Sequence, residues 1–81
     1  MGDSVPEKVL TYVASQLVDD PEAVQIDADE ADGSVDLRLS VGKDDMGRVI
    51  GRRGRNAQAI RTVVRAAGAR AGVEASVDIV D

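Results

Sequence analysis

The chain has 81 residues, enough for one small domain, and its 43% of hydrophobic residues can form a folded core. That core must be aliphatic, because the chain has one Tyr and neither Phe nor Trp. The net charge is −5, and the lack of Cys and His excludes disulfides, Cys/His zinc sites and catalysis of the Ser-His-Asp or Cys-His type.

The first residues, Met1–Ser4, lack the basic region and apolar run of a secretory signal. No apolar run approaches the roughly 18 residues of a membrane span. We therefore expect a cytoplasmic protein with no membrane partner.

A first helix is predicted after Ser4. Ser4 and Glu7 have the spacing of a capping box. Pro21 disfavours helical geometry at the residue before it, so the helix should end near Asp19 and Asp20. Apolar residues recur between these limits at helical spacing, at Val9, Leu10, Val13 and Leu17.

Two strands should follow. Val24, Ile26 and Ala28 alternate with polar residues, and the segment Val35–Val41 alternates more clearly. The dipeptide Asp32-Gly33 between them favours a hairpin turn.

Two helices and a last strand complete the chain. Asp44 or Asp45 can cap a short helix that ends at Ile50, and a longer helix is expected from about Arg55 to Arg70. The inward stripe of the longer helix is predicted to be Ile60, Val63, Val64 and Ala67. Residues 73–79 then alternate as a third strand.

The predicted fold class is α+β, with the order α-β-β-α-α-β in a single domain over residues 1–81. A helical crossover joins the second and third strands, so they should run parallel in a three-stranded mixed sheet. Three helices should cover one face of that sheet.

Positive charge is concentrated in one segment. Between Met46 and Val73 there are no acids and seven arginines, at positions 48, 52, 53, 55, 61, 65 and 70. Because the Debye length is about 8 Å at physiological salt, a bound ligand experiences this local charge more than the distant total. The segment suits a polyanion, and the alternative is a solvated basic helix face.

The most informative motif is Gly51-Arg52-Arg53-Gly54. Glycine adopts backbone conformations closed to other residues and lets a polymer approach closely. Arginine adds a fixed charge and a donor fork suited to phosphate. A short loop of this composition can hold a nucleic-acid backbone.

Two other glycine motifs fail on residue identity. A P-loop needs Lys and Ser/Thr after its second glycine, but Arg48 and Val49 follow Gly47. A dinucleotide fingerprint needs a glycine where Val49 stands, and it follows a strand, whereas a helix is predicted here.

A Gly-x-x-Gly loop between two helices, after Val-Ile and before Ile60, resembles the KH domain, whose loop clamps about four nucleotides of single-stranded backbone. The element order matches the bacterial, type II form. The chain is also similar to the KhpA-type family, small bacterial RNA-binding proteins with one KH domain, in segments 17–24, 45–55, 59–64 and 77–81.

The resemblance implies that Gly51, Arg52, Arg53 and Gly54 contact phosphates and that an adjoining groove holds the nucleotides. The start of the second long helix also favours an anion there. Two arginines, where many relatives have one basic residue, should raise affinity and salt sensitivity more than sequence discrimination. The alternative role of Arg52 and Arg53 is solubility.

Neighbours of the loop are further RNA-binding candidates. Arg48, Arg55 and Arg61 are placed to reach phosphates. Ile50 is the better candidate of the Val49–Ile50 pair for lining the groove, with core packing as its alternative, and Ile60 is expected in the core.

The remaining basic residues are weaker candidates. The strand Val35–Val41 is expected beside the groove, which would place Arg38 and Lys43 at its rim. Arg65 and Arg70 are expected to be solvated helix residues.

Tyr12 and the acids near residue 28 are weaker functional candidates. Tyr12 is expected to be partly in the core, so base stacking is mostly unavailable. Asp27, Asp29 and Glu30 suggest a metal site or an acid pair, but Asp27 and Asp29 lie opposite the apolar strand face, so exposure explains them. No cofactor is expected.

The sequence therefore favours a single-stranded RNA-binding protein and not an enzyme, with single-stranded DNA as an alternative ligand. The resemblance implies an RNA chaperone or post-transcriptional regulator linked to cell elongation, division and shape. It also implies a homodimer, or a heterodimer with a larger KH-containing protein. A dimerisation module with secondary RNA binding is the alternative, since Ala57, Ala59, Ala66 and Ala69 would allow close helix packing.

Overall fold

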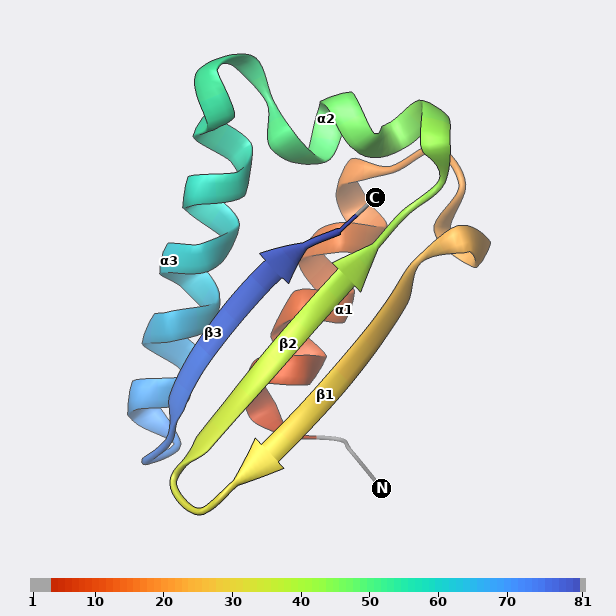
Figure 1. The fold of residues 1–81 in the computed structure, drawn as a ribbon. Helices are drawn as coiled ribbons and strands as arrows, with labels where there is room; N and C mark the ends of the chain where they lie inside the picture. The colour runs from red at the N-terminus through yellow and green to blue at the C-terminus, as the bar shows by residue number, and fades with distance from the viewer. Residues whose placement is uncertain (1–3, 81) are drawn as a thin grey trace.

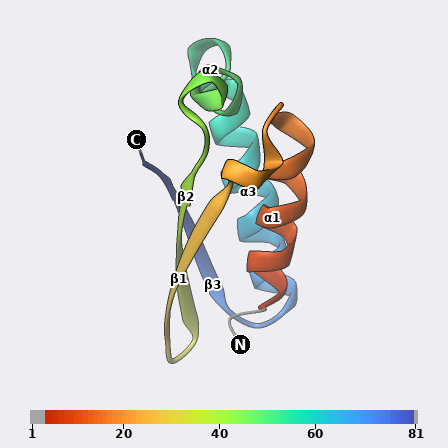
Figure 2. The same cartoon turned by 90° about the vertical axis from the view of Figure 1, so that its right-hand side faces the viewer.

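The computed structural model describes residues 4–80, so the terminal residues Met1–Asp3 and Asp81 lie outside it. Its elements are α1 (Val5–Leu17), β1 (Gln25–Ala31), β2 (Ser34–Ser40), α2 (Met46–Ile50), α3 (Arg55–Arg70) and β3 (Glu74–Ile79), with short 3-10 turns at Pro21–Ala23, Lys43–Asp45 and Arg52–Gly54. The sheet forms one layer and the helices a second layer on one of its faces (Figure 1, Figure 2). The predicted order α-β-β-α-α-β is confirmed.

Helix α1 begins as the sequence predicts. The Ser4 side chain accepts a hydrogen bond from the backbone N–H of Glu7 at 3.2 Å, and Pro6 stands in the first turn, where its missing N–H costs nothing. The Glu7 carboxylate does not complete the capping box, because its buried Oε1 has no hydrogen-bond partner within residues 4–80. Leu10 and Ala14 face the core.

The sheet has the strand order β1-β2-β3. Strands β1 and β2 pair antiparallel from Gln25 opposite Ser40 to Ala31 opposite Ser34, around the predicted turn. Strands β2 and β3 pair parallel, with Leu37 opposite Val77. The mixed sheet is therefore confirmed, and β2 is its central strand.

The core lies between β2 and the helices. The side chains of Val35, Leu37 and Leu39 alternate toward the helix layer and are almost completely buried. All helices contribute to the same cluster, through Leu10 and Ala14 of α1, Val49 of α2, and Ile60 and Val64 of α3. No helix within residues 4–80 is long and apolar enough to cross a membrane.

Two details of the predicted core are wrong. Ala28 is exposed although it lies on the inward face of β1, because β1 is an edge strand that makes few contacts with α1. Val63 is 46% exposed, because the buried face of α3 is formed by Ala57, Ile60, Val64 and Gly68.

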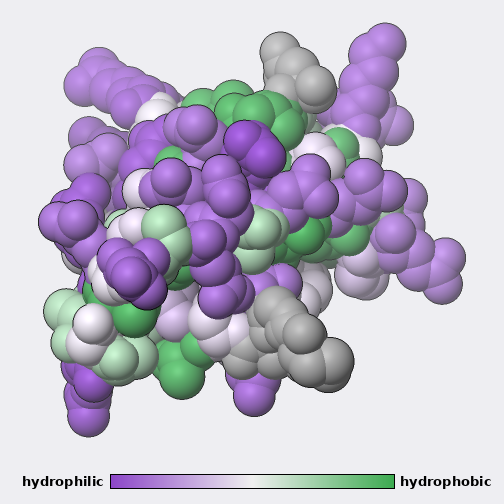
Figure 3. All heavy atoms as spheres, turned by 60° about the horizontal axis from the view of Figure 1, so that its bottom comes forward, coloured by the Kyte–Doolittle hydropathy of each residue, from purple (hydrophilic) through white to green (hydrophobic). Residues whose placement is uncertain are grey.

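The open face of the sheet carries mainly acids. Asp27, Asp29, Asp36 and Asp78 are exposed there, and Arg38 lies between Asp27 and Asp78 in the strand register. The Ser76 hydroxyl donates to Asp36 Oδ1 at 2.6 Å across β2 and β3. Hydrophilic side chains also dominate the face of the molecule seen in Figure 3, with apolar atoms in smaller patches between them.

Gly68 allows α3 to lie against β3. A Cβ added at Gly68 would stand 2.9 Å from both the Ala75 Cβ and the Val73 carbonyl oxygen. The backbone of Val73 is also held against α3, because its N–H donates a hydrogen bond to the Gly68 carbonyl at 2.8 Å. Close approach of backbone to backbone therefore requires glycine here.

We expect Gly68→Ala to lower the free energy of unfolding by about 1–2 kcal/mol, because overpacking exceeds the gain in helix propensity. Gly47→Ala in α2 is the control, since nothing lies within 4 Å of its added Cβ and helix propensity should raise stability by up to about 1 kcal/mol. Urea unfolding measures both. Equal effects of the two substitutions would contradict the packing argument.

Candidate nucleic-acid interface

A tight bend connects α2 to α3. The Gly54 N–H donates to the Gly51 carbonyl at 3.1 Å, which closes a four-residue turn with Arg52 and Arg53 at its centre. Gly51, Arg53 and Gly54 all have positive φ, at 75°, 59° and 72°. The Arg55 N–H donates to the Arg52 carbonyl, so the turn continues directly into α3.

The first glycine is required by both conformation and space. A Cβ at Gly51 would stand 2.7 Å from Asn56 Cγ and 2.9 Å from the Asn56 backbone N. Asn56 belongs to the first turn of α3, and its Nδ2 donates to the Arg48 carbonyl of α2 at 2.7 Å. This side chain therefore joins the two helices across the bend.

Arg53 is the one non-glycine residue with positive φ among residues 4–80. The left-handed conformation costs an ordinary residue roughly 1 kcal/mol, and such strain persists where the surrounding structure imposes it. The strain lies at the centre of the basic loop.

The loop's positive charge is exposed and not neutralised. Arg52, Arg53 and Arg55 are exposed, and none forms an ion pair with an acid of residues 4–80. Arg48 differs, because its Nη1 lies 2.6 Å from Asp19 Oδ1, and this hydrogen bond raises the pKa of Arg48. The charge of Arg48 is therefore balanced within the chain.

Asp45 does not act as the predicted helix cap, because its side chain forms no capping bond with α2. Asp45 is 3% exposed, and its carboxylate accepts hydrogen bonds from the backbone N–H groups of Asp19 and Asp20, each at 3.1 Å. Those two donors follow α1, so Asp45 fixes the start of α2 to the end of α1. Asp44 is exposed.

The Val49–Ile50 pair divides between core and surface. Val49 is completely buried, whereas Ile50 is 40% exposed immediately before Gly51. The structure thus excludes pure core packing for Ile50 and leaves an apolar side chain beside the loop. Ile60 is buried, as expected.

The strand beside α3 is β3, and the expectation that Val35–Val41 borders the groove is wrong. Strand β2 is paired on both sides, whereas β3 is an edge strand packed along α3 (Figure 1). Arg38 consequently lies on the open face of the sheet. Lys43 lines a hollow that is also lined by Asp19, Asp20, Asp44, Asp45 and Arg48.

Arg61 lies apart from the loop. It is half-buried on α3, and its Nε donates to the Val77 carbonyl of β3 at 3.2 Å. Arg65 and Arg70 are exposed farther along α3, as expected.

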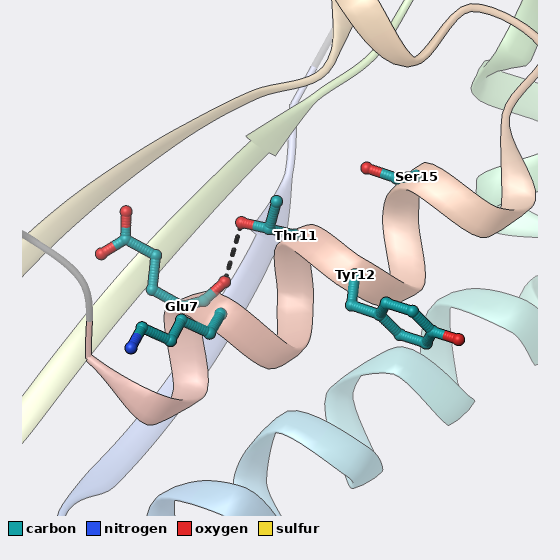
Figure 4. Close-up of a pocket in the computed structure, with 5 residues that line it drawn as sticks. Glu7, Thr11, Tyr12 and Ser15 are labelled. Carbon is teal, nitrogen blue, oxygen red and sulfur yellow. Dashed lines mark hydrogen bonds between the residues drawn. The ribbon is translucent and has the colours of Figure 1, made fainter.

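Tyr12 is 68% exposed, so the expectation that its ring is partly in the core is wrong. Figure 4 shows it on the outer side of α1, where Glu7, Thr11 and Ser15 line the same shallow hollow. The Thr11 hydroxyl donates to the Glu7 carbonyl at 2.9 Å and so stays on its own helix. Ala57 is buried, which removes it from the predicted alanine surface, whereas Ala59, Ala66 and Ala69 are exposed.

The acids of β1 show no metal-site geometry. Asp27, Asp29 and Glu30 are exposed, and no group of three or more potential metal-ligating side chains is found in the described part of the chain. Strand alternation alone accounts for the outward position of Asp27 and Asp29.

Comparison with known proteins agrees with this geometry. The family model of the KhpA/KhpB KH domain matches residues 7–79. The chain belongs to this KH-domain family. The order of its helices and strands and its mixed sheet are consistent with the type II KH fold.

The chain is 41% identical over 81 residues to the RNA-binding protein KhpA of Bacillus subtilis (strain 168), covering 100% of both chains. It is 44% identical over 75 residues to the RNA-binding protein KhpA of Listeria monocytogenes serovar 1/2a, covering 93% of this chain and 99% of the relative. It is 40% identical over 74 residues to the RNA-binding protein KhpA of Clostridium perfringens (strain 13 / Type A), covering 91% and 99%. Membership of this KH family agrees with a binding module and not an enzyme.

Sequence reasoning missed two residues that hold the KH loop in place. Asn56 gave no signal, because its partner is a backbone carbonyl that only the bend brings close. The sequence indicates Asp45 only as a helix cap, since its hydrogen-bond partners lie 25 and 26 residues away. Asp45 connects the start of α2 to the chain after α1, and Asn56 connects the end of α2 to α3.

We expect Arg53→Asn to raise the free energy of unfolding by about 0.5–1 kcal/mol, because Asn tolerates the left-handed region better than Arg. Arg52→Asn removes the same charge at a residue without positive φ and should give no such gain. Thermal unfolding measures both variants. Equal melting temperatures would show that Arg53 is not strained.

Proposed function

We propose that the chain binds single-stranded RNA, with the loop Gly51–Gly54 on the phosphate backbone and the adjoining surface on the bases. The observation that carries the proposal is the exposed pair Arg52 and Arg53 at the centre of a turn with no neutralising acid in the described residues. The names of the KhpA relatives as RNA-binding proteins support the same ligand.

The backbone at the N-terminus of α3 favours phosphate binding beside the loop. Helix α3 is 16 residues long, and no side chain caps its N-terminus at Gly54. The first N–H groups of a helix lack intrahelical partners and attract anions, and the helix dipole adds to this effect. The guanidinium groups of Arg52, Arg53 and Arg55 add full charges at the same end.

The charge distribution favours RNA binding at the basic loop over binding at the open face of the sheet. Acids cover the open face of the sheet, including Asp27, Asp36 and Asp78. A polyanion is repelled there and attracted to the basic loop on the helix side. Arg48 contributes less than the loop arginines, because Asp19 balances its charge.

Base contacts near the loop must be mainly aliphatic or polar. Ile50 supplies an apolar surface beside Gly51, and the ring of Tyr12 lies on the outer side of α1. Without aromatic stacking, one copy binds weakly and with loose sequence preference. Such binding suits an RNA chaperone or post-transcriptional regulator, the role we propose in cell elongation and division.

The double variant Arg52→Asp/Arg53→Asp should reduce affinity for a short single-stranded RNA by at least about tenfold, because it reverses two charges at the phosphate contact. The matched control Arg65→Asp/Arg70→Asp changes net charge equally at the far end of α3 and should weaken binding much less. Fluorescence anisotropy at several salt concentrations measures affinity and salt slope.

The wild-type slope should be about −0.7 per phosphate contacted, and the loop variant should lose part of it. Thermal unfolding checks that both variants stay folded. Unchanged affinity in the folded loop variant would eliminate the loop as the binding site. An equal loss of affinity in both double variants would show that net charge, and not the loop, determines binding.

A second candidate function is self-association through the outer side of α3. Ala59, Val63 and Ala66 recur at helical spacing on one exposed stripe, with Val63 46% exposed. A homodimer would place two weak RNA sites on one molecule and increase avidity. A heterodimer with a larger KH-containing protein could use the same stripe.

Val63→Glu should convert a dimer to a monomer, because it places an unpaired charge in the centre of the proposed contact. Gln58→Glu, about 140° around α3 from Val63, is the control and should keep the wild-type mass. Sedimentation equilibrium measures the mass of each variant. A wild-type monomer, or a dimer that survives Val63→Glu, would exclude this surface.

A further inference from the structure

Arg61 is held against the free edge of the sheet. Strand β3 pairs only with β2, so its other edge is unpaired within residues 4–80. The Glu74 N–H donates to the Gly33 carbonyl and the Val80 N–H donates to the Leu39 carbonyl, so the even-numbered residues of this segment direct their backbone groups toward β2. Val77 therefore directs its N–H and C=O toward the free edge, where Arg61 Nε reaches the carbonyl at 3.2 Å.

That hydrogen bond orients the Arg61 guanidinium but leaves its other N–H donors available. An arginine has five N–H donors in a planar fork, and the bond to Val77 occupies the one on Nε. No acid of the described chain forms an ion pair with Arg61. The two terminal nitrogens thus remain as a pair of oriented donors.

The position of Arg61 separates it from the phosphate contact. It lies six residues after Arg55 on α3, which is about 9 Å along the helix axis. The Val77 N–H and the backbone groups of Ile79 lie on the same edge of β3 and can form further hydrogen bonds. A strand held at the loop would bring its bases, and not only its backbone, past this edge.

We propose that Arg61 reads a base, and that the base it accepts offers two adjacent hydrogen-bond acceptors. Guanine has such a pair at O6 and N7, and cytosine has one at O2 and N3, whereas adenine and uracil place a donor beside each acceptor. The inference rests on the proposed RNA binding. It gives Arg61 a role in base preference where the sequence suggested a phosphate contact.

The first test measures the base preference of the intact wild-type protein. Short labelled RNAs of uracil alone, or of uracil alternating with adenine, guanine or cytosine, are compared by anisotropy at one salt concentration. RNA containing guanine or cytosine should bind at least about fivefold tighter than the other two. If guanine is the base, replacing it with 7-deazaguanine removes N7 and should abolish the gain, whereas inosine should retain it.

The second test uses Arg61→Lys, which keeps the charge but loses the planar fork. This variant should bind all four RNAs about equally, because it loses the gain for guanine or cytosine, whereas the control Arg70→Lys should keep the wild-type preference. A wild type that binds without base preference, or an Arg61→Lys variant that keeps the preference, would overturn the inference.

Another outcome would assign Arg61 to protein contacts. If its role is to cover the edge of β3 against a partner strand, Arg61→Lys would self-associate while the base preference stays unchanged. Absence of binding to all four RNAs would instead contradict the proposed function itself, and the inference would fail with it.

Discussion

The bend from α2 to α3 is the constraint on which the rest of the structure depends. Three of its four residues have positive φ, and one of these, Arg53, is not glycine. A Cβ at Gly51 would also collide with Asn56. These conditions turn the chain sharply enough to leave Arg52 and Arg53 exposed beside the N-terminus of α3. The same backbone geometry therefore brings together side-chain charge and the positive end of the α3 helix dipole.

The remainder of the chain holds this bend in place and keeps anions away from other surfaces. Buried Asp45 connects the start of α2 to the chain after α1, and Val49 fixes α2 in the core. Asn56 joins the far end of α2 to α3. Asp27, Asp29, Asp36 and Asp78 lie on the open face of the sheet, and no acid occurs between Met46 and Val73. A chain with a net charge of −5 therefore still presents a basic site at the bend.

Much of this architecture was predictable because its signals are local. The Ser4 cap, the alternation in β2 and the glycines of the loop each depend on neighbours in sequence, and they predicted the element order and the parallel pairing of β2 with β3. The errors have tertiary causes. Ala28, Val63 and Tyr12 depend on which faces neighbouring elements cover, and Asp45 finds partners far along the chain. We expected β2 beside the groove, but β3 is the strand packed along α3. This depends on the order of strands in the sheet, which the periodicity of the sequence does not determine.

The central claim is that the bend itself contacts the RNA backbone, and an NMR titration of the labelled protein with short single-stranded RNA tests it most directly. Backbone amide shifts should change most at Gly51, Arg52, Arg53 and Gly54, with smaller changes at Ile50 and along the edge of β3. Changes confined to the outer side of α1 and α3, or to the acidic face of the sheet, with an unperturbed loop would contradict the account.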